Sequence, residues 1–114
     1  MKRVLLLFFL HVLLVSGCGD GEEVNFSSIT GLISAKEGSR ILVIENVTQE
    51  QLEQFEIDEI LNKGLGSAAI WFEVEDQQLF DDLRVGEKVL VEYDMVAESY
   101  PGQSKAINIR RLEE

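Results

Sequence analysis

The chain has 114 residues, of which 21 are acidic and 10 basic, for a formal net charge of −11. This length suits one domain with a modest core, and the acid surplus argues against nucleic acid as a partner, because phosphates attract clustered Lys and Arg. A single histidine, His11, and a single cysteine, Cys18, exclude an internal disulfide and leave little for metal or nucleophilic chemistry.

The first 17 residues have the pattern of an export signal. Lys2 and Arg3 precede an apolar run over residues 4–15, shorter than the about 20 residues that a membrane-crossing helix needs. Residues 15–18 then place one aliphatic and two small residues before Cys18, which resembles the signal box of bacterial lipoproteins. We therefore expect cleavage before Cys18 and a diacylglyceryl group on its thiol, which would anchor the protein on the extracytoplasmic face of the bacterial cell membrane.

Cleavage would remove His11 together with Lys2 and Arg3. The remaining chain has 8 basic and 21 acidic residues, a net charge of −13, and residues 18–27 form its lipidated cysteine and a flexible, polar tether. With Cys18 acylated, no thiol and no imidazole remain, so we expect neither an enzyme nor a bound cofactor or metal. An ordinary secretory signal with an incidental cysteine is the alternative interpretation of the same residues.

Period-two alternation of apolar and polar residues dominates residues 28–114 and predicts a single, mainly β domain. In the first strand Ile29, Gly31 and Ile33 share one face. Gly38 and Ser39 make a turn into a β-branched second strand over residues 40–44.

A helical segment over residues 48–63 follows, as one bent helix or two short ones. Thr48 and Gln51 match a capping box at its start, and we expect the segment to cover the sheet. Its apolar residues lie on two faces, with Ile57, Ile60 and Leu61 on one and Leu52 and Phe55 on the other.

The third strand, over residues 69–74, places Ile70, Phe72 and Val74 inward and Trp71 on the opposite face. A short helix capped by Asp76 then presents apolar side chains that would plug one end of a barrel. The fourth strand covers residues 88–94, and the fifth includes residues 106–109.

Five strands with a short helix between the third and the fourth predict a small, OB-like Greek-key barrel. In the simplest barrels of this type a tight hairpin joins strands two and three, whereas here residues 47–67 intervene. An α+β sheet with a helical cover is therefore the alternative fold.

Three segments carry a resemblance to a known family. Residues 40–43 read Arg-Ile-Leu-Val, residues 69–72 read Ala-Ile-Trp-Phe, and residues 97–103 read Ala-Glu-Ser-Tyr-Pro-Gly-Gln. Together they resemble the YobA-like family of small bacterial lipoproteins with a domain of unknown function. The resemblance implies a fold and a location, and it brings no activity, substrate or catalytic residue.

The loop before the fifth strand contains the candidate binding residues. Pro101 and Gly102 make a defined turn that could present Glu98 and Tyr100 rigidly. In OB barrels the loop between strands four and five commonly binds ligands. The candidate contact surface is Glu98, Tyr100 and Gln103, with Trp71 as a further member.

Each candidate also has a purely structural interpretation. Tyr100 could pack on the end of the barrel while Glu98 or Gln103 satisfies backbone groups of the turn. Trp71 could be half covered by the neighbouring helix rather than form a platform for a ligand.

The sequence therefore predicts a lipid-anchored, non-catalytic binding or interaction domain, with an envelope protein or a small ligand as its partner. The alternative is an envelope accessory protein that sequesters a small ligand or a divalent cation on its acidic surface.

The anchor gives a first testable expectation. Replacing Cys18 with Ser should release the protein into the medium or leave an unprocessed precursor, because no thiol remains to receive lipid. Metabolic labelling with a radioactive fatty acid, followed by fractionation, measures this. Unchanged labelling of the Cys18→Ser variant would contradict the expectation.

Overall fold

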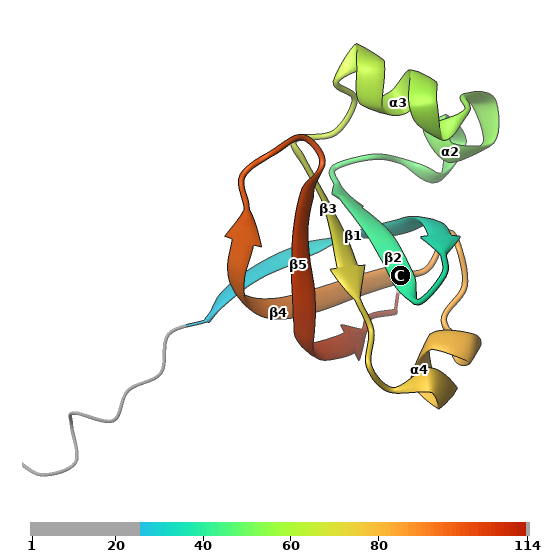
Figure 1. The fold of residues 1–114 in the computed structure, drawn as a ribbon. Coiled ribbons are helices and arrows are strands. Elements are labelled where there is room, and N and C mark those ends of the chain that lie inside the picture. Colours follow the sequence, from blue (N-terminus) through green and yellow to red (C-terminus); the bar gives the residue numbers. More distant parts are fainter. Residues whose placement is uncertain (1–25, 114) are drawn as a thin grey trace, which may run out of the picture.

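Five strands form a closed barrel within residues 26–113, the part of the chain that the computed structural model describes (Figure 1). Their order around the barrel is β1-β2-β3-β5-β4; β3 and β5 pair in parallel, and the other neighbours are antiparallel. This arrangement confirms the OB-like barrel, so the alternative of an open α+β sheet is wrong. The strands are β1 (Ser27–Glu37), β2 (Arg40–Glu45), β3 (Ala68–Glu73), β4 (Lys88–Ala97) and β5 (Gly102–Arg111).

Strand β1 pairs with two different neighbours along its length. Residues from Ser27 to Leu32 pair with β4, and residues from Leu32 to Glu37 pair with β2. Where the partner changes, the end of β2 lies against Gly31: a Cβ on Gly31 would lie 2.3 Å from the backbone oxygen of Ile44. The crossing of β1 and β2 therefore requires glycine at this position.

Three strands are longer than the alternation predicts. β1 begins at Ser27, inside the predicted tether, and continues to Glu37; β4 continues to Ala97, and β5 begins at Gly102. Most residues of their added ends are polar or exposed, and ladder pairing holds these ends: Glu37 pairs with Arg40, and Ala97 with Gln103. Hydrophobic periodicity cannot show such ends because pairing, not burial, defines them.

The core fills the inside of the barrel. The three residues predicted to face inward on the third strand belong to it: Ile70 and Phe72 on β3, and Val74, which directly follows β3. The centroid of the Phe72 ring lies 5.4 Å from that of Tyr93 on β4. The predicted inward faces of β1 and β4 are also confirmed. Other members include Ile29, Ile33, Ile41, Val43, Val89 and Val91.

A second apolar cluster lies outside the barrel and is covered by two short helices, α2 (Gln49–Gln54) and α3 (Ile57–Lys63). Both begin with a capping box, the predicted one at Thr48 and another at Glu56. The chain bends between the helices, so apolar residues on different helical faces reach the same cluster. It contains Leu32, Leu42, Ile44, Val47, Ile60 and Ala69, with Leu52, Phe55, Ile57 and Leu61 packed against it.

The third helix, α4 (Gln77–Asp82), closes one end of the barrel (Figure 1). Asp76 caps it as predicted, and Phe80 and Leu83 enter the barrel core. The Lys36 ammonium group donates hydrogen bonds of 2.7 Å to the backbone oxygens of Phe80 and Leu83, which fixes the end of α4 to β1.

No helix of residues 26–113 is long and apolar enough to span a membrane.

The predicted leader over residues 1–17, Cys18 and the tether up to residue 25 lie outside the described residues.

An ion pair joins the beginning of β4 to the end of β5. The Arg111 guanidinium donates to the Glu87 carboxylate, with Nη2 and Oε1 3.2 Å apart. This hydrogen bond is the main cause of the lowered pKa of the Glu87 carboxyl and of the raised pKa of Arg111.

The contact at Gly31 gives a testable prediction. Gly31→Ala should lower the free energy of unfolding by about 3 kcal/mol, because the added methyl group meets backbone that must move. Gly38→Ala is the matched control: it meets no atom within 4 Å but has a φ of 65°, so about 1 kcal/mol is expected. Urea unfolding measures both free energies of unfolding. Equal losses in the two variants would contradict the requirement for glycine where β1 and β2 cross.

The ion pair predicts a pH dependence. Because folding lowers the pKa of Glu87, the pair stabilises the protein above the usual glutamate pKa of about 4.3, and this contribution disappears as the pH falls through the lowered value. Glu87→Gln should cost at most about 1 kcal/mol at pH 7, and this cost should shrink as the pH falls below the usual glutamate pKa. Thermal unfolding from pH 7 to 2 measures this. The control variant Glu53→Gln, on α2, should lose stability with falling pH as the wild type does. If the stability of Glu87→Gln also fell with pH in parallel with that of the wild type, the prediction would be wrong.

Candidate functional site

The loop between β4 and β5 presents its side chains to solvent. Tyr100 is 57% exposed, and Glu98 is exposed as well. The Ser99 hydroxyl donates a 2.8 Å hydrogen bond to the backbone oxygen of Pro101, across the Tyr100–Pro101 cis peptide bond. A turn closed by its own hydrogen bond therefore holds Tyr100 outward.

This geometry differs from the structural interpretation of the loop. Tyr100 does not pack on the end of the barrel, and Ser99, rather than Glu98 or Gln103, satisfies a backbone group of the turn. Gln103 is the second residue of β5 and its side chain is exposed. The three loop candidates are thus free to contact another molecule.

Two neighbouring residues that the sequence argument missed add apolar surface to this loop. Met95 is 74% exposed and Val96 is 37% exposed, both near the end of β4. The Met95 backbone oxygen accepts a hydrogen bond from the Ser104 hydroxyl, which ties this end of β4 to β5. We define the β4–β5 tip as Met95, Val96, Glu98, Tyr100 and Gln103.

Phe26 extends the exposed apolar surface toward the beginning of the domain. It is exposed and directly precedes Ser27, which pairs with Tyr93, two residues before Met95. The only sequence signal for these residues is the unbroken apolar pair Met95-Val96, where the alternation of β4 stops.

Trp71 is placed differently from the rest of the candidate surface. It is half-buried on the outer face of β3, packed against the cluster beneath α2 and α3, and the Arg40 guanidinium lies 4.4 Å from its ring centroid. Its partner in the ladder is Gln103. The structure therefore puts Trp71 beside the base of the tip, in the half-covered position, and not on the exposed loop.

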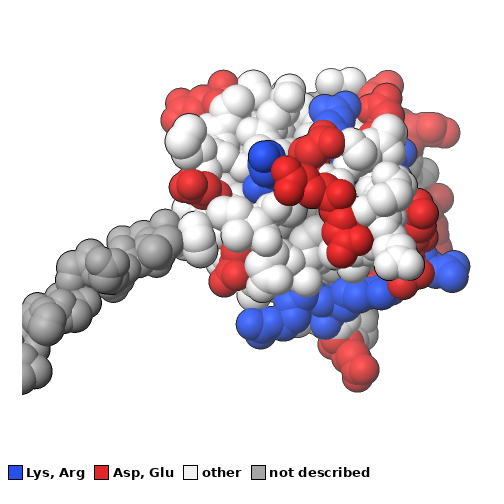
Figure 2. Space-filling model, turned by 60° about the horizontal axis from the view of Figure 1, so that its bottom comes forward, with Lys and Arg blue, Asp and Glu red and all other residues white. Residues whose placement is uncertain are grey.

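The charges are unevenly distributed over the surface. Figure 2 shows a stripe of Lys and Arg along one margin of the face that it presents, and a few further Lys and Arg side chains among acidic groups over the remainder. Among residues 26–113, no three His, Cys, Asp or Glu side chains come together in a group that could hold a metal ion. Part of the surface is therefore positively charged although the net charge of the protein is negative.

The tip is a projection rather than a cavity. Clefts of about 400 Å³ and 300 Å³ in the described part of the chain have none of the tip side chains in their lining. Exposed Met and Val at the end of β4 and Tyr on the turn that follows provide contact area for a large partner. A small molecule would remain mostly in water on such a surface.

Comparison with known proteins places the chain in a family. Residues 30–113 match the family model described as "Protein of unknown function (DUF3221)", which is more than half of the chain. The chain belongs to the DUF3221 family. Among curated proteins, none matches this DUF3221 chain.

Two solved structures have the same fold as this DUF3221 domain. A crystal structure of a yobA protein from Bacillus subtilis is 22% identical, with a TM-score of 0.67, over 81% of this chain and 100% of that chain. A solution structure of Bacillus subtilis YobA 21–120 is 23% identical, with a TM-score of 0.58, over 84% of this chain and 90% of that one. The YobA-like resemblance is therefore confirmed for the domain and its fold.

Proposed function

We propose that this protein is a membrane-anchored, extracytoplasmic lipoprotein whose domain acts without catalysis by binding another envelope protein through the β4–β5 tip. The exposure of Met95 and Val96 at the end of β4 and of Tyr100 on the hydrogen-bonded turn that follows carries this proposal. Met and Tyr are enriched where proteins contact each other, and exposed apolar side chains that gather at one place mark such surfaces.

The order of the loop supports a protein partner. The Ser99 and Ser104 hydroxyl groups bond to backbone oxygens in and beside the loop, so less conformational freedom remains to be lost on binding. Glu98 adds a charged group next to the apolar side chains, as at the polar rim of an interface. We therefore expect a partner surface with an apolar pocket and a basic residue beside it.

The anchor and the tip are compatible with each other. If Cys18 carries lipid, the residues between it and Phe26 reach on the order of 15 Å as a flexible chain, which keeps the domain close to the membrane. Ser27, which follows Phe26, pairs with Tyr93 of β4, so the beginning of β1 and the later part of β4 lie on the same side of the barrel (Figure 1). The proposed partner is accordingly a protein of the same membrane or one that lies close to it.

The sequence supports a non-catalytic role. The chain has no histidine after His11 and no cysteine other than the proposed lipid attachment site. For the alternative of cation sequestration, the described residues provide no group of ligands, so we do not propose it.

A photo-crosslinking experiment in intact cells tests the proposal. A photoreactive amino acid at Tyr100 should give a discrete adduct, because this side chain would be covered by the partner, whereas one at exposed Glu113 should not. Adducts of equal yield at both positions, or none at Tyr100, would contradict the proposed surface.

Substitutions then separate the tip from exposed apolar side chains in general. With a probe at the exposed Glu98, Met95→Ser should reduce the adduct about tenfold, the effect of about 1.4 kcal/mol lost at an interface. Val85→Ser is the matched control, because Val85 is also more than half exposed but lies outside the tip. An equal reduction by both variants would argue against the tip as the binding surface.

A further inference from the structure

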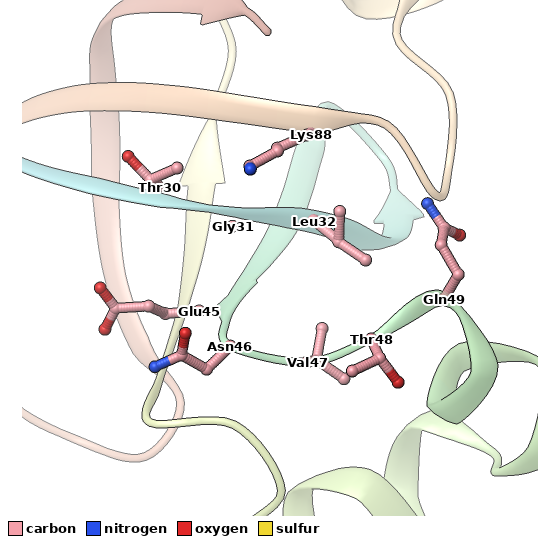
Figure 3. Close-up of a pocket in the computed structure, with 9 residues that line it drawn as sticks. All are labelled: Thr30, Gly31, Leu32, Glu45, Asn46, Val47, Thr48, Gln49 and Lys88. Carbon is pink, nitrogen blue, oxygen red and sulfur yellow. The ribbon is translucent and has the colours of Figure 1, made fainter. Parts of the chain in front are cut away.

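A polar cleft of about 400 Å³ lies between the outer face of β1 and the connection from β2 to α2 (Figure 3). Side chains of β1 and β4 form one side of it, and the connection forms the other. The lining residues are Thr30, Gly31, Leu32, Glu45, Asn46, Val47, Thr48, Gln49 and Lys88. None of them belongs to the β4–β5 tip.

The register of β1 leaves backbone groups open along this cleft. In an antiparallel ladder, residues direct their N–H and C=O alternately to the two sides. Ile33 donates to the backbone oxygen of Glu87, and Lys88, which pairs with Leu32, accepts from Leu112 on the opposite side. By alternation, the N–H and C=O of Thr30 point away from β4 and toward the cleft.

Among the described strands, none satisfies these Thr30 groups on the cleft side. Pairing with β2 begins only at Leu32, opposite Ile44, and β2 ends at Glu45. Asn46 has a left-handed backbone with a φ of 65°, which turns the chain away from β1. Within residues 26–113, Thr30 has no backbone hydrogen bond to the β2–α2 connection. A short edge of β1 is therefore open, and an unpaired donor and acceptor favour a hydrogen-bonding partner.

Hydrogen bonds hold the opposite wall of the cleft in place. Asn46 Nδ2 donates to Ser67 Oγ at 2.8 Å, and that hydroxyl donates to Glu45 Oε1 at 3.1 Å. At the other end, Gln49 Nε2 donates to the backbone oxygen of Gly86 at 2.6 Å. The cleft is thus formed before any ligand enters, which reduces the entropy lost on binding.

Lys88 provides a positive charge at this open edge. In Figure 3 its side chain lies between the ribbons of β4 and β1, with the ammonium nitrogen toward Thr30, and Lys88 is only partly exposed. In the described part of the chain, no carboxylate oxygen lies within 4 Å of its ammonium group, although Lys105 and Arg111 both have such partners. A carboxylate in the cleft would pair with Lys88 without displacing an internal partner.

We propose that this cleft binds an extended peptide segment with an acidic side chain. The segment adds as a short strand to the open edge of β1, so that its backbone bonds to the N–H and C=O of Thr30 while its carboxylate pairs with Lys88. Backbone pairing supplies affinity and the charged group supplies selectivity. This second site is distinct from the tip, and neither depends on the other.

Nuclear magnetic resonance of the ¹⁵N-labelled full chain in detergent micelles tests this site. The probe is the peptide acetyl-Val-Thr-Val-Glu-Val-Thr-amide, and the comparison peptide has Lys in place of Glu. The acidic peptide should shift the Thr30 amide signal saturably downfield and slow its hydrogen exchange, because this N–H gains an acceptor. The Lys peptide should bind at least about tenfold more weakly.

Two pairs of variants separate the proposed contacts. Thr30→Pro removes the open N–H but no bond of the β1–β4 ladder, and should abolish binding, whereas Thr30→Val keeps the N–H and should bind as the wild type does. Lys88→Gln should weaken binding about tenfold, and Arg110→Gln, whose residue is absent from the lining, should not. If Thr30→Pro does not fold, the comparison of Lys88→Gln with Arg110→Gln and the shift of the Thr30 amide signal in the wild type still test the proposal.

Three outcomes would overturn the proposal. One is the absence of a saturable shift at Thr30 at millimolar peptide, and another is equal binding by Thr30→Pro and the wild type. The third is reproduction of the same shifts by acetate alone, which would make the cleft a site for small anions.

Discussion

The fold depends on the way in which β1 is shared between two neighbours. Its first half pairs with β4 and its second half with β2, so one strand closes the barrel only if it changes partner at Gly31 and Leu32. The backbone oxygen of Ile44 occupies the space that a side chain at position 31 would need. Because β2 begins to pair only beyond this crossing, the same constraint that closes the barrel leaves the edge of β1 at Thr30 open.

The insertion between β2 and β3 changes what the outside of the barrel offers. Simple OB barrels have a tight hairpin here and a free outer face on strands two and three. In this protein α2 and α3 cover an apolar cluster on that face, and Trp71 becomes part of its margin, with Arg40 over its ring. The same insertion supplies Asn46 and Gln49 as a wall for the cleft. Exposed apolar side chains are found instead in the β4–β5 tip, at Met95, Val96 and Tyr100.

Charge and shape separate the two surfaces. The tip is a projection with exposed Met95 and Tyr100, which suits the flat or concave surface of another protein. The cleft is concave and polar, with Lys88 beside an open strand edge, which suits a single extended chain. Although the domain has a surplus of acidic residues, the cleft thus presents the cation of Lys88, which suits a carboxylate. The tip presents apolar side chains, which suit contact with another protein.

The sequence by itself determined which residues of β3 and β4 face inward, because alternation fixes them, and where two helices begin, because Thr48 and Asp76 cap them. It indicated a mainly β fold, and the tertiary structure decided for the closed barrel over the α+β sheet. The sequence also indicated the loop of Tyr100, because Pro and Gly restrict the backbone locally. Only the tertiary structure decided that Tyr100 is exposed while Trp71 is half covered, since burial depends on segments distant in sequence. The open edge at Thr30 likewise follows from the register between β1, β2 and β4, which no local pattern records.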